Sequence, residues 1–284
     1  MKSILILTDF SEESFRAAEY GCEMARLLQV DQIVLFHAYQ TVVSIIDIPL
    51  SSVENNVVIH EENMGMLAMQ QERLKPMAGD IRFNLIANDG FLPEGINQIC
   101  YEEGVELIVM GVSGKSGFER TVLGSTTARM LENIEFPLLI VPAEAVIGNG
   151  VKSVVFASTL KNTTELPMLR LFAFLDAFKP SLAVVNVETP AEQGKYSPQL
   201  REGVEHLQKR LAKYQPAFYY IEGDDVVESL LVFAAEHKSS MIIGVPEKHG
   251  VLSFHKSVSK KLAYNSKIPF LALPAIQKTN PAMA

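Results

Sequence analysis

The first half of the chain alternates between continuous apolar runs and stretches in which apolar residues keep helical spacing. Runs without polar interruptions are typical of strands buried on both faces of a parallel sheet. They predict five strands, at residues 3–8, 33–38, 81–87, 107–111 and 137–141. The stretches between them predict four helices, from Ser11 to about Leu28, over roughly 61–78, from Pro93 onward and over about 125–134. Residues 39–60 are predicted to be irregular.

The second half of the chain repeats this pattern. Four of its apolar runs match runs of the first half in the same order, namely 152–157 with 2–7, 182–187 with 33–38, 241–245 with 108–112 and 268–274 with 136–142. Ordered matches at similar spacing indicate a tandem duplication. Strands that alternate with helices predict an α/β fold with doubly wound parallel sheets. We therefore expect one domain over 1–143, a second over 151–275 and a tail over 276–284.

Composition narrows the functional classes. The 284 residues carry a net charge of −8, which argues against nucleic acid as a main partner because a phosphate backbone attracts a basic surface. No apolar run reaches the length of a membrane span or of a signal peptide core. Cys22 and Cys100 form no CxxC motif, which predicts reduced thiols in a cytoplasmic protein.

A glycine-rich stretch follows the fourth predicted strand. It reads Gly111-x2-Gly114-x9-Gly124-Ser125 and leads into a predicted helix. Glycines allow the backbone to approach an anion, and the free N–H groups of a helix start can bind phosphate. The alternative is structural: the glycines turn the chain, and Ser125 or Thr126 caps the helix.

A second reading of the same loop can be rejected. Gly114-Lys115-Ser116 looks like the end of a Walker A motif. That motif requires a glycine five positions before Gly114, where this chain has Val109 in the middle of a predicted strand. The chain is therefore not expected to be a P-loop NTPase.

Three features together resemble the universal stress protein family. They are Asp9 directly after the first strand, the glycine pattern of 111–125, and the closing Pro-Leu-Leu-Ile-Val-Pro of 137–142. The glycine pattern is the one that marks the ATP-binding branch of the family. The resemblance implies two tandem five-stranded parallel sheets of adenine-nucleotide α-hydrolase-like topology, with strand order 3-2-1-4-5. Ligands of such sheets bind where the strand order reverses, here between strands 1 and 4.

The resemblance also implies a nucleotide site in the first domain. Thr8 and Asp9 would lie beside the adenosine, and Ala38 would offer backbone groups to the adenine. The ribose and phosphates would be held by residues of the glycine loop, namely Gly111, Val112, Gly114, Gly124, Ser125 and Thr126. Lys115 and Arg120 could neutralise phosphate charge, or be solvated loop charges. Asp9 has an alternative role as a cap of the first helix.

The second domain departs from the pattern. Thr159 stands where the first domain has Asp9, and Glu247 stands where it has Gly114. The helix start reads Lys256-Ser257 in place of Gly124-Ser125. We expect this second site to be degenerate, with a structural or regulatory role.

The sequence favours binding over catalysis. No nucleophile–base pair is visible, no histidine shows metal-ligand spacing, and His37 is expected to be a satisfied core residue. The primary hypothesis is a regulatory stress protein that binds ATP or another adenine nucleotide, with Mg²⁺ as a companion ion. The alternative is a scaffold that acts through protein contacts alone. A weaker alternative is a slow ATPase or another enzyme of the wider nucleotide-hydrolase-like group.

The predicted fifth strands suggest how the chain assembles. Residues 137–141 and 269–273 are apolar edge strands, which tend to pair. We expect them to pair with each other within the chain, as an intramolecular pseudo-dimer. The apolar segment Val42–Ile48 could support a homodimer, or could fold over the nucleotide as a lid.

Overall fold

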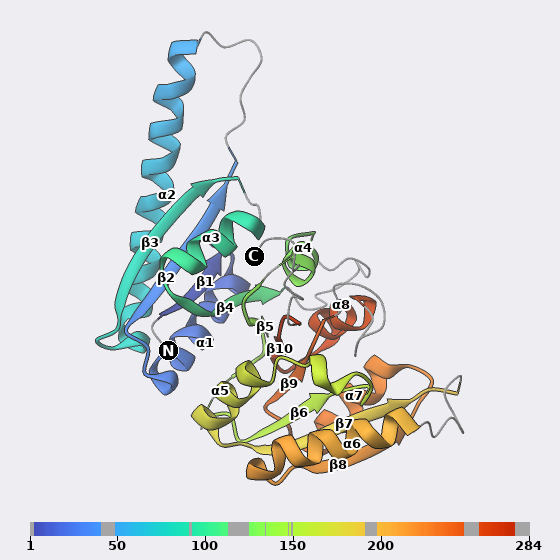
Figure 1. Cartoon of the computed structure of the whole chain (residues 1–284). Coiled ribbons are helices and arrows are strands. Elements are labelled where there is room, and N and C mark those ends of the chain that lie inside the picture. Colours follow the sequence, from blue (N-terminus) through green and yellow to red (C-terminus); the bar gives the residue numbers. More distant parts are fainter. Residues whose placement is uncertain are drawn as a thin grey trace, which may run out of the picture. The chain divides into compact units, whose positions relative to one another are not determined.

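The computed structural model describes most of the chain (Figure 1). The described residues are 3–40, 49–90, 93–112, 125–133, 135–146, 148, 150–190, 198–246 and 256–275. The chain divides into two compact units, Met1–Gly148 and Asn149–Ala284. The division falls between the two predicted domains.

Unit 1 contains the five strands that the apolar runs predict. They are β1 (Ser3–Thr8), β2 (Gln32–Tyr39), β3 (Arg82–Asp89), β4 (Val105–Val112) and β5 (Leu138–Pro142). Within this unit the order is β3-β2-β1-β4-β5, and each neighbouring pair is parallel. The predicted order 3-2-1-4-5 is thus confirmed, and the reversal falls between β1 and β4.

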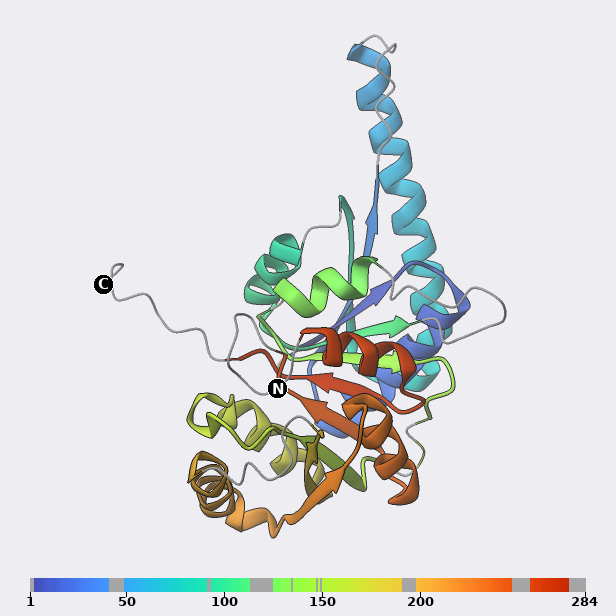
Figure 2. The ribbon, with the colours of Figure 1, turned by 90° about the vertical axis from the view of Figure 1, so that its right-hand side faces the viewer.

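Helices cover both faces of this sheet. They are α1 (Glu12–Leu28), α2 (Pro49–Ala78), α3 (Pro93–Glu102) and α4 (Ser125–Asn133). Figure 2 shows α1 and α2 on one side of the strands and α3 and α4 on the other. The central strand β1 is apolar on both faces for this reason, and its residues Ile4 to Ile6 are completely buried.

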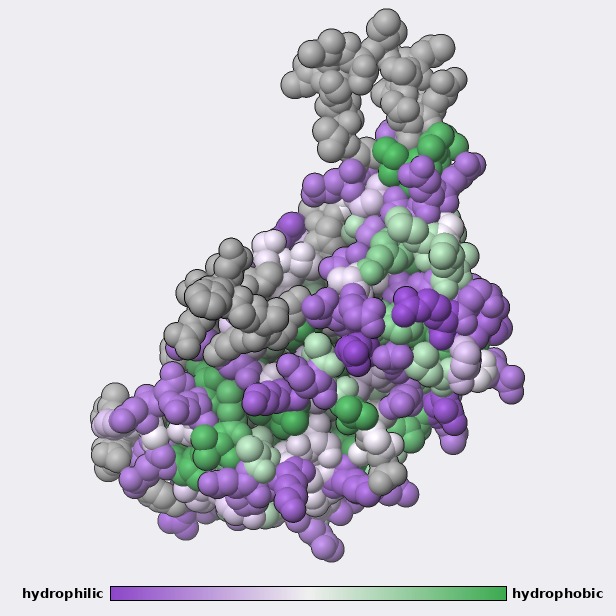
Figure 3. Space-filling view, turned by 180° about the vertical axis from the view of Figure 1, so that it is seen from behind, coloured by the Kyte–Doolittle hydropathy of each residue, from purple (hydrophilic) through white to green (hydrophobic). Residues whose placement is uncertain are grey.

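Helix α2 corrects one prediction. It begins at Pro49 and runs for 30 residues, so the expectation of irregular structure over 49–60 is wrong. Proline is favourable at the first position of a helix, but the β-branched residues around Val57 lower helix propensity and obscured the signal. Figure 1 shows the first turns of α2 beyond the carboxyl ends of β2 and β3. Val57 and Val58 are exposed on them, and Figure 3 shows apolar side chains gathered near this end.

Unit 2 repeats the architecture. Its strands are β6 (Ser153–Ala157), β7 (Ser181–Glu188), β8 (Ala217–Glu222), β9 (Met241–Gly244) and β10 (Phe270–Ala272), all in parallel pairs in the order β10-β9-β6-β7-β8. Its helices are α5 (Met168–Phe178), α6 (Pro198–Leu211), α7 (Val226–Glu236) and α8 (Lys256–Asn265), with 3₁₀ turns at Thr163–Glu165 and Ala212–Tyr214. Numbered from its own first strand, this is the same topology as unit 1, which confirms the tandem fold.

Candidate functional site

The strand order of unit 1 brings several predicted site residues to one edge of the sheet. In the parallel register Thr8 lies opposite His37, which precedes Ala38, and Ile6 lies opposite Val109. Thr8, Ala38 and the pair Gly111 and Val112 therefore stand at the carboxyl ends of three adjacent strands. Asp9 follows β1 directly. This is the edge at which open α/β sheets bind their ligands.

The other predicted residues divide into two groups. Ser125 and Thr126 are the first two residues of α4, and both are exposed. Four predicted residues lie outside the described part of the chain, namely Gly114, Lys115, Arg120 and Gly124. The segment Val42–Ile48, predicted as a lid or a dimer contact, and Glu247 of the second domain also lie outside it.

The hydroxyl of Thr8 fixes the turn that follows β1. Thr8 is buried, and its Oγ1 accepts the N–H of Phe10 at 3.0 Å. The same hydroxyl donates to Oε1 of Gln70 at 2.9 Å and lies 3.1 Å from Oγ of Ser14. These contacts connect the turn to α1 and α2. They give the Thr8 side chain a structural role next to the predicted site.

Asp9 presents an exposed carboxylate at this turn. Its Oδ1 accepts the backbone N–H of Ser11 at 3.0 Å and also the Ser11 hydroxyl. Ser11 is the N-cap of α1 and accepts the N–H of Ser14 at 3.2 Å. Asp9 therefore orients the capping residue and is not the cap itself. Desolvation raises the pKa of Asp9, but the hydrogen bonds from Ser11 outweigh it and hold the pKa below its ordinary value, so the carboxylate is charged at neutral pH.

Phe10 is a site residue that the sequence reasoning missed. Its φ of 64° lies in the left-handed region, which a bulky residue rarely adopts. Its ring packs on the His37 ring with 4.2 Å between centroids. Nδ1 of His37 donates to the Thr8 carbonyl at 2.8 Å, so the histidine is hydrogen-bonded as expected. No property of the Asp9-Phe10-Ser11 sequence indicates a left-handed residue.

Unit 2 contains the same turn with different side chains. Ser158 Oγ accepts the N–H of Leu160 at 3.1 Å, and Leu160 has a φ of 58°. Thr159 Oγ1 accepts the N–H of Lys161 at 3.4 Å, and Asn186 donates to the Ser158 carbonyl at 3.0 Å. The turn thus belongs to the repeated fold. The carboxylate of Asp9 belongs to unit 1 alone, because Thr159 takes its place in unit 2.

Gly111 has a packing role. A Cβ built at Gly111 would stand 2.9 Å from the Glu13 carbonyl oxygen and 3.2 Å from Cβ of Ala17. The first turns of α1 approach β4 closely here, and only glycine leaves enough space. Gly244 of β9 is similarly close to another group, because its Cβ would stand 3.0 Å from the Phe270 ring. Gly111 by itself is therefore weak evidence for a ligand.

Neither a metal site nor a membrane-spanning helix is found in the part of the chain that the structure describes. Among the residues that the structure describes, no three His, Cys, Asp or Glu side chains are grouped closely enough to hold a metal ion. Within the same residues, no helix has the length and hydropathy that crossing a bilayer requires.

Comparison with known proteins supports the interpretation of the fold. The sequence model of the universal stress protein family matches residues 1–142, half of the chain. The chain belongs to the universal stress protein family. Universal stress protein MJ0531 of Methanocaldococcus jannaschii is 28% identical over 145 residues, which cover 49% of this chain and 81% of that protein. Universal stress protein MJ0577 of the same organism is 25% identical over 153 residues, with 49% and 94% covered.

A solved structure shares the fold over nearly the whole length of the chain. The crystal structure of a universal stress protein from Archaeoglobus fulgidus covers 96% of this chain and 98% of its own, with a TM-score of 0.71 and 18% identity. At this level of identity the likeness shows the fold. Together with the two single-length relatives, each of which covers about half of the chain, it fits a tandem family member.

Proposed function

We propose that unit 1 binds ATP or another adenine nucleotide at the carboxyl ends of β1 and β4. The observation that carries this proposal is the charged, exposed Asp9, held by Ser11 at the point where the strand order reverses. A carboxylate in this position can accept a hydrogen bond from a ribose hydroxyl. Ala38, at the end of the adjacent strand, can offer its backbone N–H and C=O to the adenine edge.

The phosphates are assigned to the glycine loop. Backbone N–H groups around Gly114 and Gly124, and the hydroxyls of Ser125 and Thr126 at the start of α4, can donate to phosphate oxygens. Lys115 and Arg120 supply positive charge to an otherwise acidic protein. Mg²⁺, where it accompanies the nucleotide, would be bound largely through the phosphates and water.

We further propose that binding serves regulation and that unit 2 does not share it. Membership of the universal stress protein family favours a regulatory role over dedicated catalysis. Thr159 has no charge to offer in place of Asp9, although the turn that would present it is intact. Unit 2 is therefore assigned a structural or regulatory role.

One observation favours a second candidate, a scaffold that acts through protein contacts alone. The packing of Gly111 against Glu13 and Ala17 explains this glycine without a ligand. The two candidates differ in whether the purified protein binds a nucleotide.

Calorimetry with ATP and Mg²⁺ tests the proposal. We expect one site per chain, with affinity reduced about tenfold or more in Asp9→Ala, because hydrogen bonds to charged groups contribute about 1.5–3 kcal/mol. Thr159→Ala is the matched control at the same turn of unit 2, and it should leave the affinity unchanged. Absence of heat with the unaltered chain would favour the scaffold. Turnover of ATP with an acceptor would instead favour an enzyme.

A further inference from the structure

Unit 1 contains a groove that the proposed nucleotide site does not use. It lies between α1, α2 and the turn after β1, with a volume of about 170 Å³. Its lining comprises two phenylalanines, two methionines and two polar residues, namely Phe10, Phe15, Met66, Met69, Gln70 and Arg73. Asp9, Ala38 and Gly111 do not line it.

The volume and the lining of the groove fit a small aromatic ring. An engineered apolar cavity of about 150 Å³ holds benzene, so the groove can accept a single six-membered ring. Phe15 is only 7% exposed and forms the buried side of the groove. Met66 and Met69 are 41% and 71% exposed and lie on its open side. Methionine side chains are flexible and polarisable, and they adapt to aromatic partners. Exposed methionines beside a phenylalanine wall suit a ligand that enters from solvent.

Arg73 adds a positive charge at this groove. Its guanidinium carbon lies 3.7 Å from the centroid of the Phe15 ring, which holds the planar group against the aromatic wall. Among the described residues, no carboxylate forms an ion pair with Arg73. A guanidinium held in one orientation is well suited to bidentate recognition of a carboxylate.

Gln70 also lines the groove, one turn away from Arg73 on the same helix. Its Oε1 accepts the Thr8 hydroxyl at 2.9 Å, which connects this side of the groove to the turn after β1. Its Nε2 has no hydrogen-bond partner among the described residues and is fully buried, so it does not face the open side of the groove. Arg73 is therefore the residue that can bind an anionic group there.

The corresponding helix of unit 2 lies directly on its turn. Gly203 of α6 precedes the buried Leu207 by four residues, as Gln70 precedes the buried Leu74. A Cβ at Gly203 would stand only 1.8 Å from the Leu160 carbonyl oxygen. At the matching place in unit 1 a glutamine contacts the turn through its side chain, which leaves space between helix and turn. The groove is therefore not a necessary consequence of the repeated fold.

We propose that this groove binds a small aromatic monocarboxylate. The ring lies against Phe10, Phe15 and the two methionines. The carboxylate accepts hydrogen bonds from the guanidinium of Arg73. The groove adjoins the candidate nucleotide site at Phe10, but binding in it does not require a nucleotide.

Calorimetry or ligand-observed NMR with benzoate and the full chain tests the proposal without any nucleotide. We expect saturable binding, about tenfold weaker in Arg73→Gln because a charge-assisted pair is lost. Arg210→Gln is the matched control. Arg210 also lies over a phenylalanine ring, 5.6 Å from that of Phe172 in unit 2, and its replacement should leave benzoate binding unchanged.

Two further probes separate the ring from the charge. Benzyl alcohol has the ring without the carboxylate and should bind more weakly than benzoate, and acetate has the carboxylate alone and should not bind. The proposal is overturned if benzoate does not bind at about 10 mM, a concentration that would reveal even millimolar affinity. It is equally overturned if Arg73→Gln binds benzoate as well as the unaltered chain, or if benzyl alcohol matches benzoate.

Discussion

At the scale of single residues, the turn after the first strand of each unit depends on one hydroxyl. Thr8 in unit 1 and Ser158 in unit 2 accept the N–H of a residue in the left-handed conformation, Phe10 or Leu160. Such a conformation costs a bulky residue about 1–3 kcal/mol. Hydrogen bonds and packing offset the cost, and the turn projects Asp9 at the edge of the sheet.

Gly111→Ala should destabilise unit 1. The new methyl group would stand 2.9 Å from the Glu13 carbonyl oxygen, and overpacking of this kind costs about 1–3 kcal/mol. Gly95→Ala in α3 is the matched control, since its Cβ meets no atom of the described residues within 4 Å and alanine favours a helix by up to about 1 kcal/mol. Denaturant unfolding of the two variants measures the difference. Equal stabilities would contradict the packing role of Gly111.

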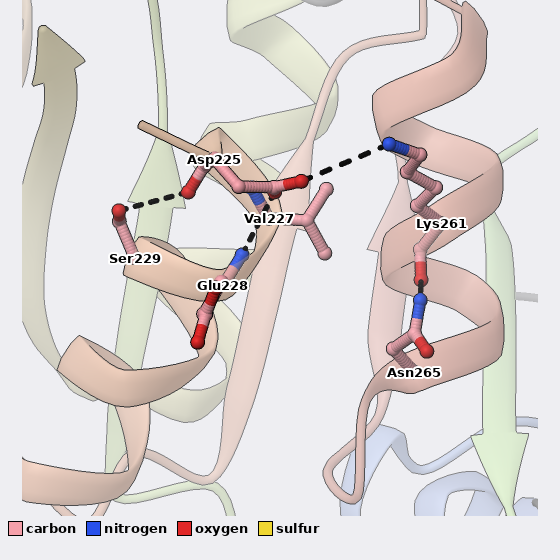
Figure 4. Close-up of polar contacts among 6 residues, drawn as sticks. All are labelled: Asp225, Val227, Glu228, Ser229, Lys261 and Asn265. Carbon is pink, nitrogen blue, oxygen red and sulfur yellow. Dashed lines mark hydrogen bonds and ion pairs between the residues drawn. The ribbon is translucent and has the colours of Figure 1, made fainter. Parts of the chain in front are cut away.

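At the scale of elements, the N-cap of α7 gives a case in which charge and helix geometry combine. Asp225 accepts the N–H groups of Val227 and Glu228 at 2.8 and 3.1 Å, and Nζ of Lys261 in α8 lies 3.7 Å from its Oδ2 (Figure 4). The hydrogen bond from Glu228, then that from Val227 and the charge of Lys261, outweigh desolvation and lower the pKa of Asp225 below its ordinary value.

Asp225→Ala should reduce the free energy of unfolding by about 1 kcal/mol at pH 7, the usual cost of losing a cap. Because the folded pKa is depressed, the charged cap stabilises the protein above the unfolded pKa of about 3.8 and loses this effect as pH falls through the folded value. The difference between the variant and the unaltered chain should therefore shrink below about pH 4. Denaturant titrations at pH 7 and pH 3 measure it, and a difference independent of pH would rule out the charge as its source.

Helix α2 shows why an element can be found while its start is misplaced. The buried Leu67 and Leu74 are spaced as one face of a helix, which revealed the second half. In the first half, Val57 and Val58 are exposed, so these two apolar residues do not mark a face of the helix that packs on the core. Helices without an apolar face on a core are the hardest to predict from sequence.

At the scale of the whole molecule, the chain contains the same fold twice, and the two copies differ in sequence at the candidate site. Both units keep the strand order, the turn and a glycine at the end of the fourth strand, Gly111 or Gly244. Only unit 1 keeps Asp9. Only in unit 1 does a side chain, Gln70, take the place of the helix contact made by Gly203.

Separating the units tests the predicted pairing of their fifth strands. Residues 1–148 produced alone should self-associate, because β5 is a five-residue apolar strand that comes last in the strand order of unit 1, and unpaired edges attract other strands. Residues 149–284 should do so less, since β10 has only three residues. The predicted pairing implies that the full chain does not associate through these strands. Light scattering after gel filtration measures the masses, and a monomeric 1–148 would contradict the pairing.

The sequence by itself determined the strands of both units and the duplication that relates them. Apolar runs indicate strands that are buried on both faces of a sheet, and the repeated order of these runs indicates the duplication. Both signals can be read from the sequence because each depends on residues that are close together in the chain. That Asp9 and Gly111 stand at the ends of adjacent parallel strands was implied by the resemblance to the universal stress protein family, and the pairing of β1 with β4 confirms it.

Only the tertiary structure decided which contacts these residues make. The left-handed Phe10, the contact of Thr8 with Gln70 and the approach of Glu13 to Gly111 join positions far apart in the chain or depend on backbone angles. The groove between α1 and α2 has the same origin. Its existence depends on how far a helix stands from a turn, and this distance is set by packing and not by any local pattern.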